Sequence, residues 1–239
     1  MSSTTARENP AGCERRGAQG FRCAPIGVYT QSVTDTDREQ INTILVYWFG
    51  QLDGPTDVDT SKNALWWAGD PTTDADIRER FGDAVARALD GALDHWAESA
   101  RGALALVILL DQFTRCLGRG SAEAYVGDAA ALCICRGAIE RGQDRELRPI
   151  ERSFLYMPLM HAEDPEVARQ SVEAFAELSK EVAGVEGYPD FSSHARGHAD
   201  IVLRFGRYPH RNELYGRTPT AEEEAFLADG GPTFGQRKR

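Results

Sequence analysis

Hydrophobic residues recur at helical spacing along most of the chain, from about residue 36 onward. The first run carries apolar side chains at positions 41, 44, 45, 48 and 49, which lie together on one face of a helix. Thr34 and Asp37 are typical of a helix start, and Gly50 is typical of a helix end. The pattern therefore predicts a first helix between these residues.

The same reasoning predicts further helices and short elements along the chain. Amphipathic helices are expected at residues 74–89, 165–183, 192–206 and 218–231, an alanine-rich helix at 122–142, and short elements near 65–67 and 93–97. Ser192 and Ser193 are the expected capping residues of the helix that ends near Gly206.

The most apolar stretch covers residues 103–110 and is followed directly by Asp111, Gln112 and Arg115. Crossing a bilayer takes roughly 20 apolar residues, so this stretch predicts a central buried helix over residues 102–117. Polar groups beside a core must be paired or must face a cavity. Two interpretations are open: a structural salt bridge between Asp111 and an arginine, or side chains that line a site.

Pro158 stands inside an otherwise helical segment that begins near residue 148. Proline lacks an amide hydrogen and clashes with the preceding turn, so we expect a bend or break that frees backbone carbonyls near His161. His161 and Glu163 are candidates for an acid/base pair or for ligands. The competing interpretation is a buried histidine held by a carboxylate.

No segment of useful length alternates apolar and polar residues, and neither a phosphate-loop glycine motif nor a GxSxG motif occurs. We therefore predict an all-α fold, an antiparallel helix array that forms a single domain over residues 36–232. Residues 1–35 are predicted to be a flexible extension that lacks the apolar run of a secretory leader. Residues 233–239 are predicted to be a frayed basic tail.

The charge balance narrows the range of partners. The formal net charge is -10, with 27% charged and 41% hydrophobic residues, which is typical of a soluble globular protein. An acidic balance argues against nucleic acid and anionic membranes as partners. Five cysteines, an odd number, do not form the dense even set of a secreted disulfide scaffold, so we expect thiols and a cytoplasmic location.

A cationic cluster between residues 204 and 217 contrasts with the acidic remainder. Its members are Arg204, Arg207, His210, Arg211, Asn212 and Arg217. Arginine offers a rigid fork of donors that matches carboxylate and phosphate groups, so the cluster indicates a pocket for an anionic or carbonyl-bearing ligand. The competing interpretation is that these arginines brace helix ends against carboxylates.

Five motifs in this order resemble the DUF924 family. They read VYWFG at residues 46–50, LWW at 65–67 with DIRERF at 76–81, LDQFTR at 110–115, RSFLYMPLMHAE at 152–163, and RFGRYPHRN at 204–212 with GR at 216–217. The resemblance implies an all-α, tetratricopeptide-like domain of stacked antiparallel helices, and the family has no general assigned activity. At Cys116, Ala162 and Tyr215 the chain departs from the usual asparagine, serine and leucine of the pattern.

The leading hypothesis is a ligand-binding protein or enzyme whose single pocket lies where the polar motifs meet. His161 or His210 would transfer a proton, with Glu163 or Asp111 orienting the imidazole. The residues expected to hold the small-molecule ligand are Gln112, Arg115, His198, Arg204, Arg207, Arg211, Asn212 and Arg217. The residues expected to form the walls are Trp48, Trp66, Trp67 and Tyr208.

Two alternatives from other classes are open. The first is a helical scaffold that binds a protein partner, or a homo-oligomer, with the polar motifs as internal braces. The second is a metal or haem protein that uses His161, His194, His198 or His210. His194 and His198 have the spacing of zincin ligands, but Ala195 stands where the zincin glutamate would be, so no metal ligand set is predicted and the cofactor is left open.

Overall fold

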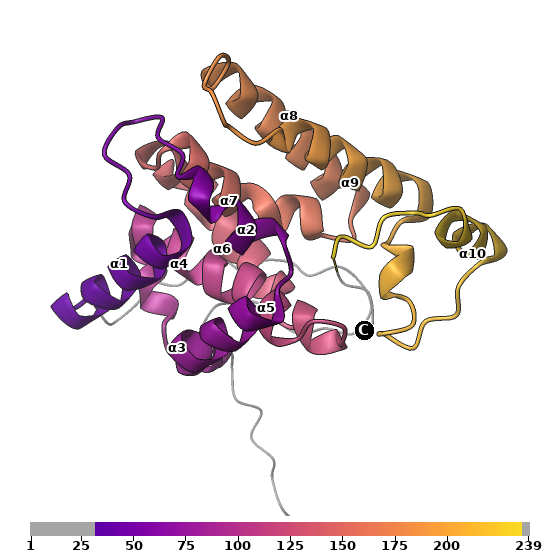
Figure 1. The fold of residues 1–239 in the computed structure, drawn as a ribbon, viewed down its shortest axis with the longest axis horizontal. Helices are drawn as coiled ribbons and strands as arrows, with labels where there is room; N and C mark the ends of the chain where they lie inside the picture. The colour runs from indigo at the N-terminus through magenta and orange to yellow at the C-terminus, as the bar shows by residue number, and fades with distance from the viewer. Residues whose placement is uncertain (1–31, 236–239) are drawn as a thin grey trace, which may run out of the picture.

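A computed structural model describes residues 32–235, and the regular elements of this range are helical (Figure 1). In chain order the α-helices are α1 (Asp35–Phe49), α2 (Asn63–Trp67), α3 (Pro71–Leu89), α4 (Ala100–Val107), α5 (Thr114–Leu117), α6 (Asp128–Glu140), α7 (Pro149–His161), α8 (Pro165–Glu181), α9 (Phe191–Phe205) and α10 (Ala221–Ala228). The shorter turns are η1 (Thr60–Lys62), η2 (Asp94–Glu98), η3 (Ile108–Phe113), η4 (Ala122–Tyr125), η5 (Gln143–Glu146) and η6 (Pro209–Arg211). The predicted all-α fold is confirmed.

The first helix begins and ends where its local sequence predicts. Thr34 and Asp37 form a capping box, in which each side chain accepts a hydrogen bond from the other residue's backbone amide. Gly50 follows the last turn with a φ of 77°, a conformation that glycine adopts without strain. These interactions satisfy orphaned amides at the start of α1 and stop the helix at Phe49.

The start of α9 corrects a prediction. Its capping residue is Asp190, whose carboxylate accepts a hydrogen bond from the Ser193 amide at 3.0 Å. The helix therefore begins at Phe191, and the serines expected to cap it lie inside its first turn. Aspartate is an equally good cap, so the sequence offered several candidates and did not decide among them.

The most apolar helix lies at the centre of the fold, as predicted, but its geometry changes halfway. α4, η3 and α5 follow one another without a break, and η3 is a π-helical turn that the sequence pattern does not predict. α1, α3, α6 and α7 all contact this run, so Asp111 and Gln112 of η3 are held inside the core. π-helical turns inside longer helices occur frequently at functional sites.

Close packing of α6 against the π-helical turn requires a glycine. A Cβ atom at Gly127 would lie 2.1 Å from the carbonyl oxygen of Leu110, a distance at which no side chain fits. Because this approach is so close, Asp128 at the start of α6 reaches Arg115 at the end of the central run. A backbone contact thus positions a carboxylate beside the candidate site.

α7 continues through Pro158 to His161, so of the bend or break expected at the proline, the break does not occur. The helix packs against α4, α6, α8 and α9, and this packing holds it helical across the missing hydrogen bond. Near its end, the Met160 carbonyl accepts a hydrogen bond from the Tyr208 hydroxyl. A carbonyl close to His161 is therefore used by the protein itself.

α8 and α9 lie side by side, and the chain beyond α9 turns back beside its C-terminal end to reach α10 (Figure 1). A small apolar cluster that includes Val202 and Tyr208 holds this return. Among residues 32–235, no helix combines the length and the apolar character of a membrane span.

The predicted domain ends are described only in part. Residues 1–31 of the predicted extension and residues 236–239 of the predicted tail lie outside the described residues. Asp35, assigned to the extension, already belongs to α1, so the helical body begins slightly earlier than predicted. Phe234 and Gly235, assigned to the tail, lie beyond the last helix and line a cavity.

Candidate functional site

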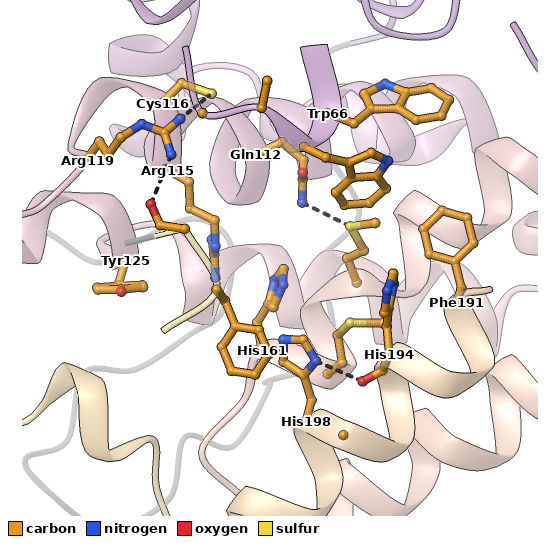
Figure 2. A pocket seen from close by; sticks show the side chains of 18 of the residues that line it. Trp66, Gln112, Arg115, Cys116, Arg119, Tyr125, His161, Phe191, His194 and His198 are labelled. Carbon is orange, nitrogen blue, oxygen red and sulfur yellow. Dashed lines mark hydrogen bonds between the residues drawn. The ribbon is translucent and has the colours of Figure 1, made fainter. Parts of the chain in front are cut away.

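A cavity of about 610 Å³ lies where three of the polar motifs meet (Figure 2). Its lining includes Gln112 and Arg115 from the central run, His161 from the end of α7, and His210 and Arg211 from η6. Further lining comes from α1, α2 and the two residues after it, Arg119, Tyr125 of η4, α9 and residues 234–235. Cavities that hold small-molecule ligands usually measure roughly 300 to 1,000 Å³, so this one has a suitable size.

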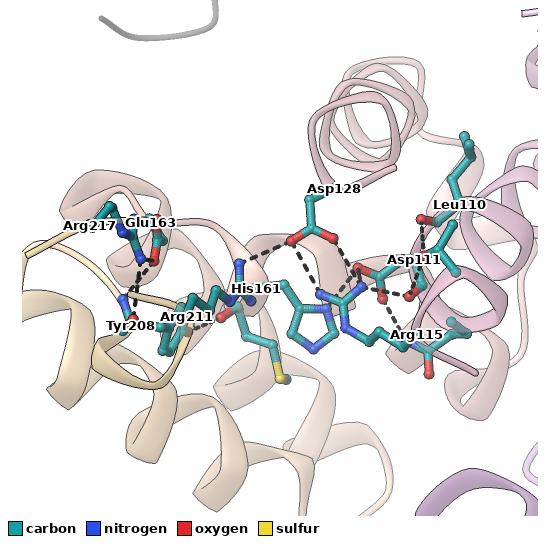
Figure 3. A network of polar contacts seen from close by, with 12 residues as sticks. Leu110, Asp111, Arg115, Asp128, His161, Glu163, Tyr208, Arg211 and Arg217 are labelled. Carbon is teal, nitrogen blue, oxygen red and sulfur yellow. Dashed lines mark hydrogen bonds and ion pairs between the residues drawn. The ribbon is translucent and has the colours of Figure 1, made fainter. Parts of the chain in front are cut away.

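Asp111 and His161 form a buried pair beside the cavity (Figure 3). The Nδ1 atom of His161 lies 2.8 Å from the Oδ1 atom of Asp111. The side chain of Asp111 is 0% exposed and that of His161 is 13% exposed. The two residues meet because η3 packs directly on α7.

The protonation of this pair follows from its surroundings. Burial would raise the pKa of Asp111, but the Arg115 charge and the hydrogen bonds from His161 and Gln112 outweigh burial and lower it below its usual range, so the carboxylate is ionised. An ionised carboxylate only accepts hydrogen bonds, so Nδ1 of His161 carries the shared proton. Burial and the nearby Arg115 lower the pKa of His161, which leaves its Nε2 atom unprotonated at neutral pH. His161 therefore presents a base to the cavity.

A chain of alternating charges continues behind this pair (Figure 3). Arg115 lies 3.1 Å from Asp111 and 3.0 Å from Asp128, and Asp128 also accepts a hydrogen bond from Arg211 at 3.1 Å. Two arginines face two carboxylates, so these four side chains carry no net charge. The arginine side chains are only 13% and 6% exposed, which makes the arrangement rigid and little screened by solvent.

Two further imidazoles lie at the same end of the cavity. The Nδ1 atom of His198 lies 2.9 Å from the His194 carbonyl oxygen, which can only accept, so this nitrogen carries the proton. The ring centroids of His198 and His161 are 5.9 Å apart. Burial is the main cause that lowers the pKa of His198, and that of His210, to about 3. Both rings are therefore neutral at physiological pH.

The C-terminal end of the described chain crosses the cavity. Phe234 stacks on His198 with ring centroids 3.8 Å apart, and its ring also meets Tyr208 edge to face. The adjacent Gly235 carbonyl accepts a hydrogen bond of 3.4 Å from Arg119, which follows α5. This segment thus contacts α9 on one wall and Arg119 on the other.

Aromatic side chains line the other end. Trp48 comes from α1, Trp66 and Trp67 come from α2, and Phe191 comes from α9. Nε1 of Trp66 donates a 2.9 Å hydrogen bond to the Trp48 carbonyl, which fixes its ring. Trp67 is 47% exposed. The three tryptophans lie where predicted, whereas Tyr208 is fully buried behind the lining.

The other predicted site residues divide between the cavity and the body of the fold. Gln112 lines the cavity and donates a hydrogen bond of 2.5 Å to Asp111. Arg204 and Arg207 lie outside the lining and bind α10, through Glu222 and Glu223 respectively. The three arginines expected at one ligand are therefore not brought together.

Glu163 does not orient a histidine. Its carboxylate accepts hydrogen bonds from Arg217 at 2.5 and 2.9 Å and from the Tyr208 amide at 2.8 Å. Asn212 is buried close to this brace and does not line the cavity. The bracing interpretation thus holds for this part of the cationic cluster, and Asp111 is the carboxylate that orients an imidazole.

Several residues in and behind the cavity lining were missed by sequence reasoning. Asp128 starts an alanine-rich helix and carries no motif, and Asp74, which binds Arg119 at 2.7 and 2.8 Å, resembles an ordinary surface residue of an amphipathic helix. Phe234 lay in a segment predicted as tail. Cys116 lines the cavity, and burial together with Asp74 raises the pKa of its thiol to about 12, so it is no thiolate nucleophile.

The histidines do not form a recognisable metal site. In the part of the chain that the structure describes, no three His, Cys, Asp or Glu side chains are grouped so that they could hold a metal ion. His194 and His198 both line the cavity. Their hydrogen bond joins the Nδ1 atom of His198 to the backbone carbonyl of His194, so the two rings do not hold a common atom between them.

Comparisons with known proteins place the chain in a family. The family DUF924, described as a bacterial protein of unknown function, matches residues 44–231. A solved structure of a protein of unknown function, ATU0120 from Agrobacterium tumefaciens, is similar with 34% identity and a TM-score of 0.68, covering 81% of this chain and 99% of that one. A search among curated proteins finds no match. The family match spans all five sequence motifs, and the chain belongs to the DUF924 family.

Proposed function

We propose that this protein binds a small molecule with a carbonyl or anionic oxygen in the cavity and transforms it by acid/base chemistry. The observation that carries the proposal is the Asp111–His161 pair, whose free Nε2 atom belongs to a residue that lines the cavity. A histidine oriented by a carboxylate is a common general base in enzymes. His161 has this arrangement, and Asp111 supplies the orientation.

The pair can take up a proton and release it without losing its geometry. When Nε2 accepts a proton, the imidazolium formed is stabilised by the ionised Asp111 carboxylate 2.8 Å from Nδ1. Arg115 keeps that carboxylate ionised, so the proton stays on the histidine and is available for return. This cycle suits proton abstraction or proton donation next to a carbonyl group.

The charges at this end restrict the ligand. Because Arg115 and Arg211 are already matched by Asp111 and Asp128, the site supplies directed donors without a net positive charge. A carbonyl or a single carboxylate fits such a site better than a phosphate with two charges. Arg204 and Arg207 have no part in this proposal, since both bind α10.

A tetratricopeptide-like interaction scaffold is the alternative, with the polar motifs acting as internal braces. The pairs Glu163–Arg217 and Glu223–Arg207 are braces of this kind. The cavity and the free base in it favour ligand binding, because a scaffold needs neither.

The test is a thermal-shift screen with monocarboxylates, ketones and aldehydes, followed by calorimetric Kd values for the hits. A ligand at a hundred times its Kd stabilises the folded state by about 2.7 kcal/mol. His161→Gln and Arg211→Lys should weaken binding of the hits at least tenfold while the circular dichroism spectrum stays native. Both substitutions keep a polar side chain of similar size.

The chain offers matched controls for both variants. His95 forms a second buried Asp–His pair, 3.1 Å from Asp37 and outside the cavity lining, and Arg204 is an arginine of the same motif bound to α10. His95→Gln and Arg204→Lys should leave the Kd values unchanged. The proposal fails if folded His161→Gln and Arg211→Lys proteins bind every hit as the wild type does, or if the whole screen yields none.

A further inference from the structure

We infer that the ligand is amphipathic, with a flat unsaturated ring system on the tryptophan end and one carboxylate or carbonyl group at the His161 end. This inference rests on the proposed function and specifies its substrate class. The cavity of about 610 Å³ is far larger than an acetate or a pyruvate needs, and it lies within the range that holds ligands of drug size. The cavity therefore has room for a body in addition to the polar head.

The two ends of the cavity differ in chemistry. Figure 2 shows Trp66 and His161 on opposite sides of the space, with Gln112 between them. The tryptophan end is formed by aromatic rings from three helices. These rings can contact a ligand by face or by edge. The histidine end carries the free base and the paired arginines. A ligand that fills both ends has one apolar and one polar part.

The aromatic wall is rigid where it is deepest. The ring of Trp66 is held by its hydrogen bond to the Trp48 carbonyl and packs against Phe49 and Phe154. Trp67 lies next to it with ring centroids 6.1 Å apart. Rings fixed in this way lose little entropy when a flat ligand stacks on them.

Trp67 is the part of this wall that a ligand would cover. The residue is 47% exposed although its ring contacts Phe154 and Phe191 with ring centroids 6.2 and 6.0 Å apart. A large exposed ring beside a cavity indicates a surface that a ligand buries on binding.

The polar end sets the head group. Three arginines line the cavity and each is matched by a carboxylate: Arg115 by Asp111, Arg119 by Asp74 and Arg211 by Asp128. A head with several negative charges would meet no uncompensated positive charge there. One carboxylate or one carbonyl oxygen is the head that this end accepts.

The experiment compares probes that differ in unsaturation, in charge and in size. Calorimetry measures Kd for 2-naphthoate, for its saturated analogue decahydro-2-naphthoate, for naphthalene-2,6-disulfonate and for acetate, all with the full chain. Aromatic contacts add roughly a 2- to 12-fold effect beyond buried area, so we expect 2-naphthoate to bind tighter than the saturated acid by that factor. The disulfonate and acetate should bind at least tenfold weaker than 2-naphthoate.

A variant pair assigns the effect to the wall. Trp67→Leu should abolish the preference for the unsaturated acid, while Phe226→Leu, an aromatic that packs on Phe205 outside the cavity, should preserve it. Equal Kd values for the two naphthoate-type acids, or a preference that survives Trp67→Leu, would overturn the inference and leave the proposed function intact.

The outcomes of the two tests are distinct. Loss of all binding on His161→Gln and Arg211→Lys, with equal affinity for both acids, supports the proposed function and rejects the unsaturated body. A failure of every probe to bind rejects the amphipathic ligand class as stated. Binding of 2-naphthoate that is sensitive to Trp67 but insensitive to His161 and Arg211 supports the aromatic wall and rejects the acid/base role.

Discussion

The neutral imidazole of His198 predicts a loss of stability in mild acid. The pKa of His198 is about 6.5 in an unfolded chain and about 3 in the folded protein, because burial disfavours the charged ring. A group whose pKa is lowered by folding contributes stability above pH 6.5, and this contribution is lost as the pH falls toward 3. From about pH 7 to about pH 5, proton uptake by the unfolded chain costs the folded state about 2 kcal/mol for this residue.

Other groups also titrate in this window, so the wild-type slope alone does not identify His198. Burial raises the pKa of Asp94 to about 6, which adds about 1.4 kcal/mol of stability over the same interval because the folded state gains a proton there. His210 adds a loss of about the same size as His198. Asp94 and His210 are present in both the wild type and a His198 variant, so their contributions cancel when the free energies of unfolding of the two proteins are subtracted.

The assay is urea unfolding of wild type and His198→Gln at pH values from 7 to 5. Glutamine does not titrate, so the free energy of unfolding of the variant should fall by about 2 kcal/mol less than that of the wild type over this range. Any loss of packing in the variant is the same at each pH and does not change the slope. Parallel pH profiles for the two proteins would refute a neutral, buried His198.

Three other predictions follow from the packing around the cavity. Gly127→Ala brings a Cβ atom against the Leu110 carbonyl and should lower the free energy of unfolding, measured in urea, by about 3 kcal/mol. Gly82→Ala places its Cβ atom in open space and should raise the free energy of unfolding by about 0.5 to 1 kcal/mol. The reverse order of stability would contradict the close contact at Gly127. Asp128→Asn leaves Arg211 without its carboxylate and should cost about 3 kcal/mol in the same assay, with little effect counting against the buried chain of charges. Phe234→Ala removes the ring stacked on His198, so acrylamide should quench tryptophan fluorescence more strongly in this variant than in the wild type. Leu203→Ala changes an exposed residue outside the cavity lining and should leave the quenching unchanged. Equal quenching of both variants would show that the C-terminal segment does not shield the cavity.

The helices could be predicted from the sequence because their causes are local. Thr34 and Asp37 cap α1 through neighbouring backbone amides, and the run from 103 to 110 is too apolar to lie anywhere but in the core. Pro158 shows where local reasoning fails. Its effect on α7 is decided by the helices packed around it, which the sequence does not reveal.

The candidate site could be predicted only in part because it depends on contacts across the fold. Asp111 and His161 were both identified, but their pairing depends on how η3 packs against α7. Arg204 and Arg211 occupy the same motif, yet one faces α10 and the other faces the cavity. The motif gave the residue types, and the direction of each side chain came from helix packing.

The central claim is that His161 is a neutral base that contacts a ligand in this cavity. Long-range 1H–15N NMR spectra of the histidine rings, recorded near neutral pH with and without 2-naphthoate, test it most directly, with His161→Gln supplying the assignment. We predict that Nδ1 of His161 is protonated, that Nε2 is unprotonated, and that the Nε2 resonance shifts when the acid is added. A doubly protonated ring, a proton on Nε2 in place of Nδ1, or His161 resonances that stay fixed while the acid binds would contradict the account.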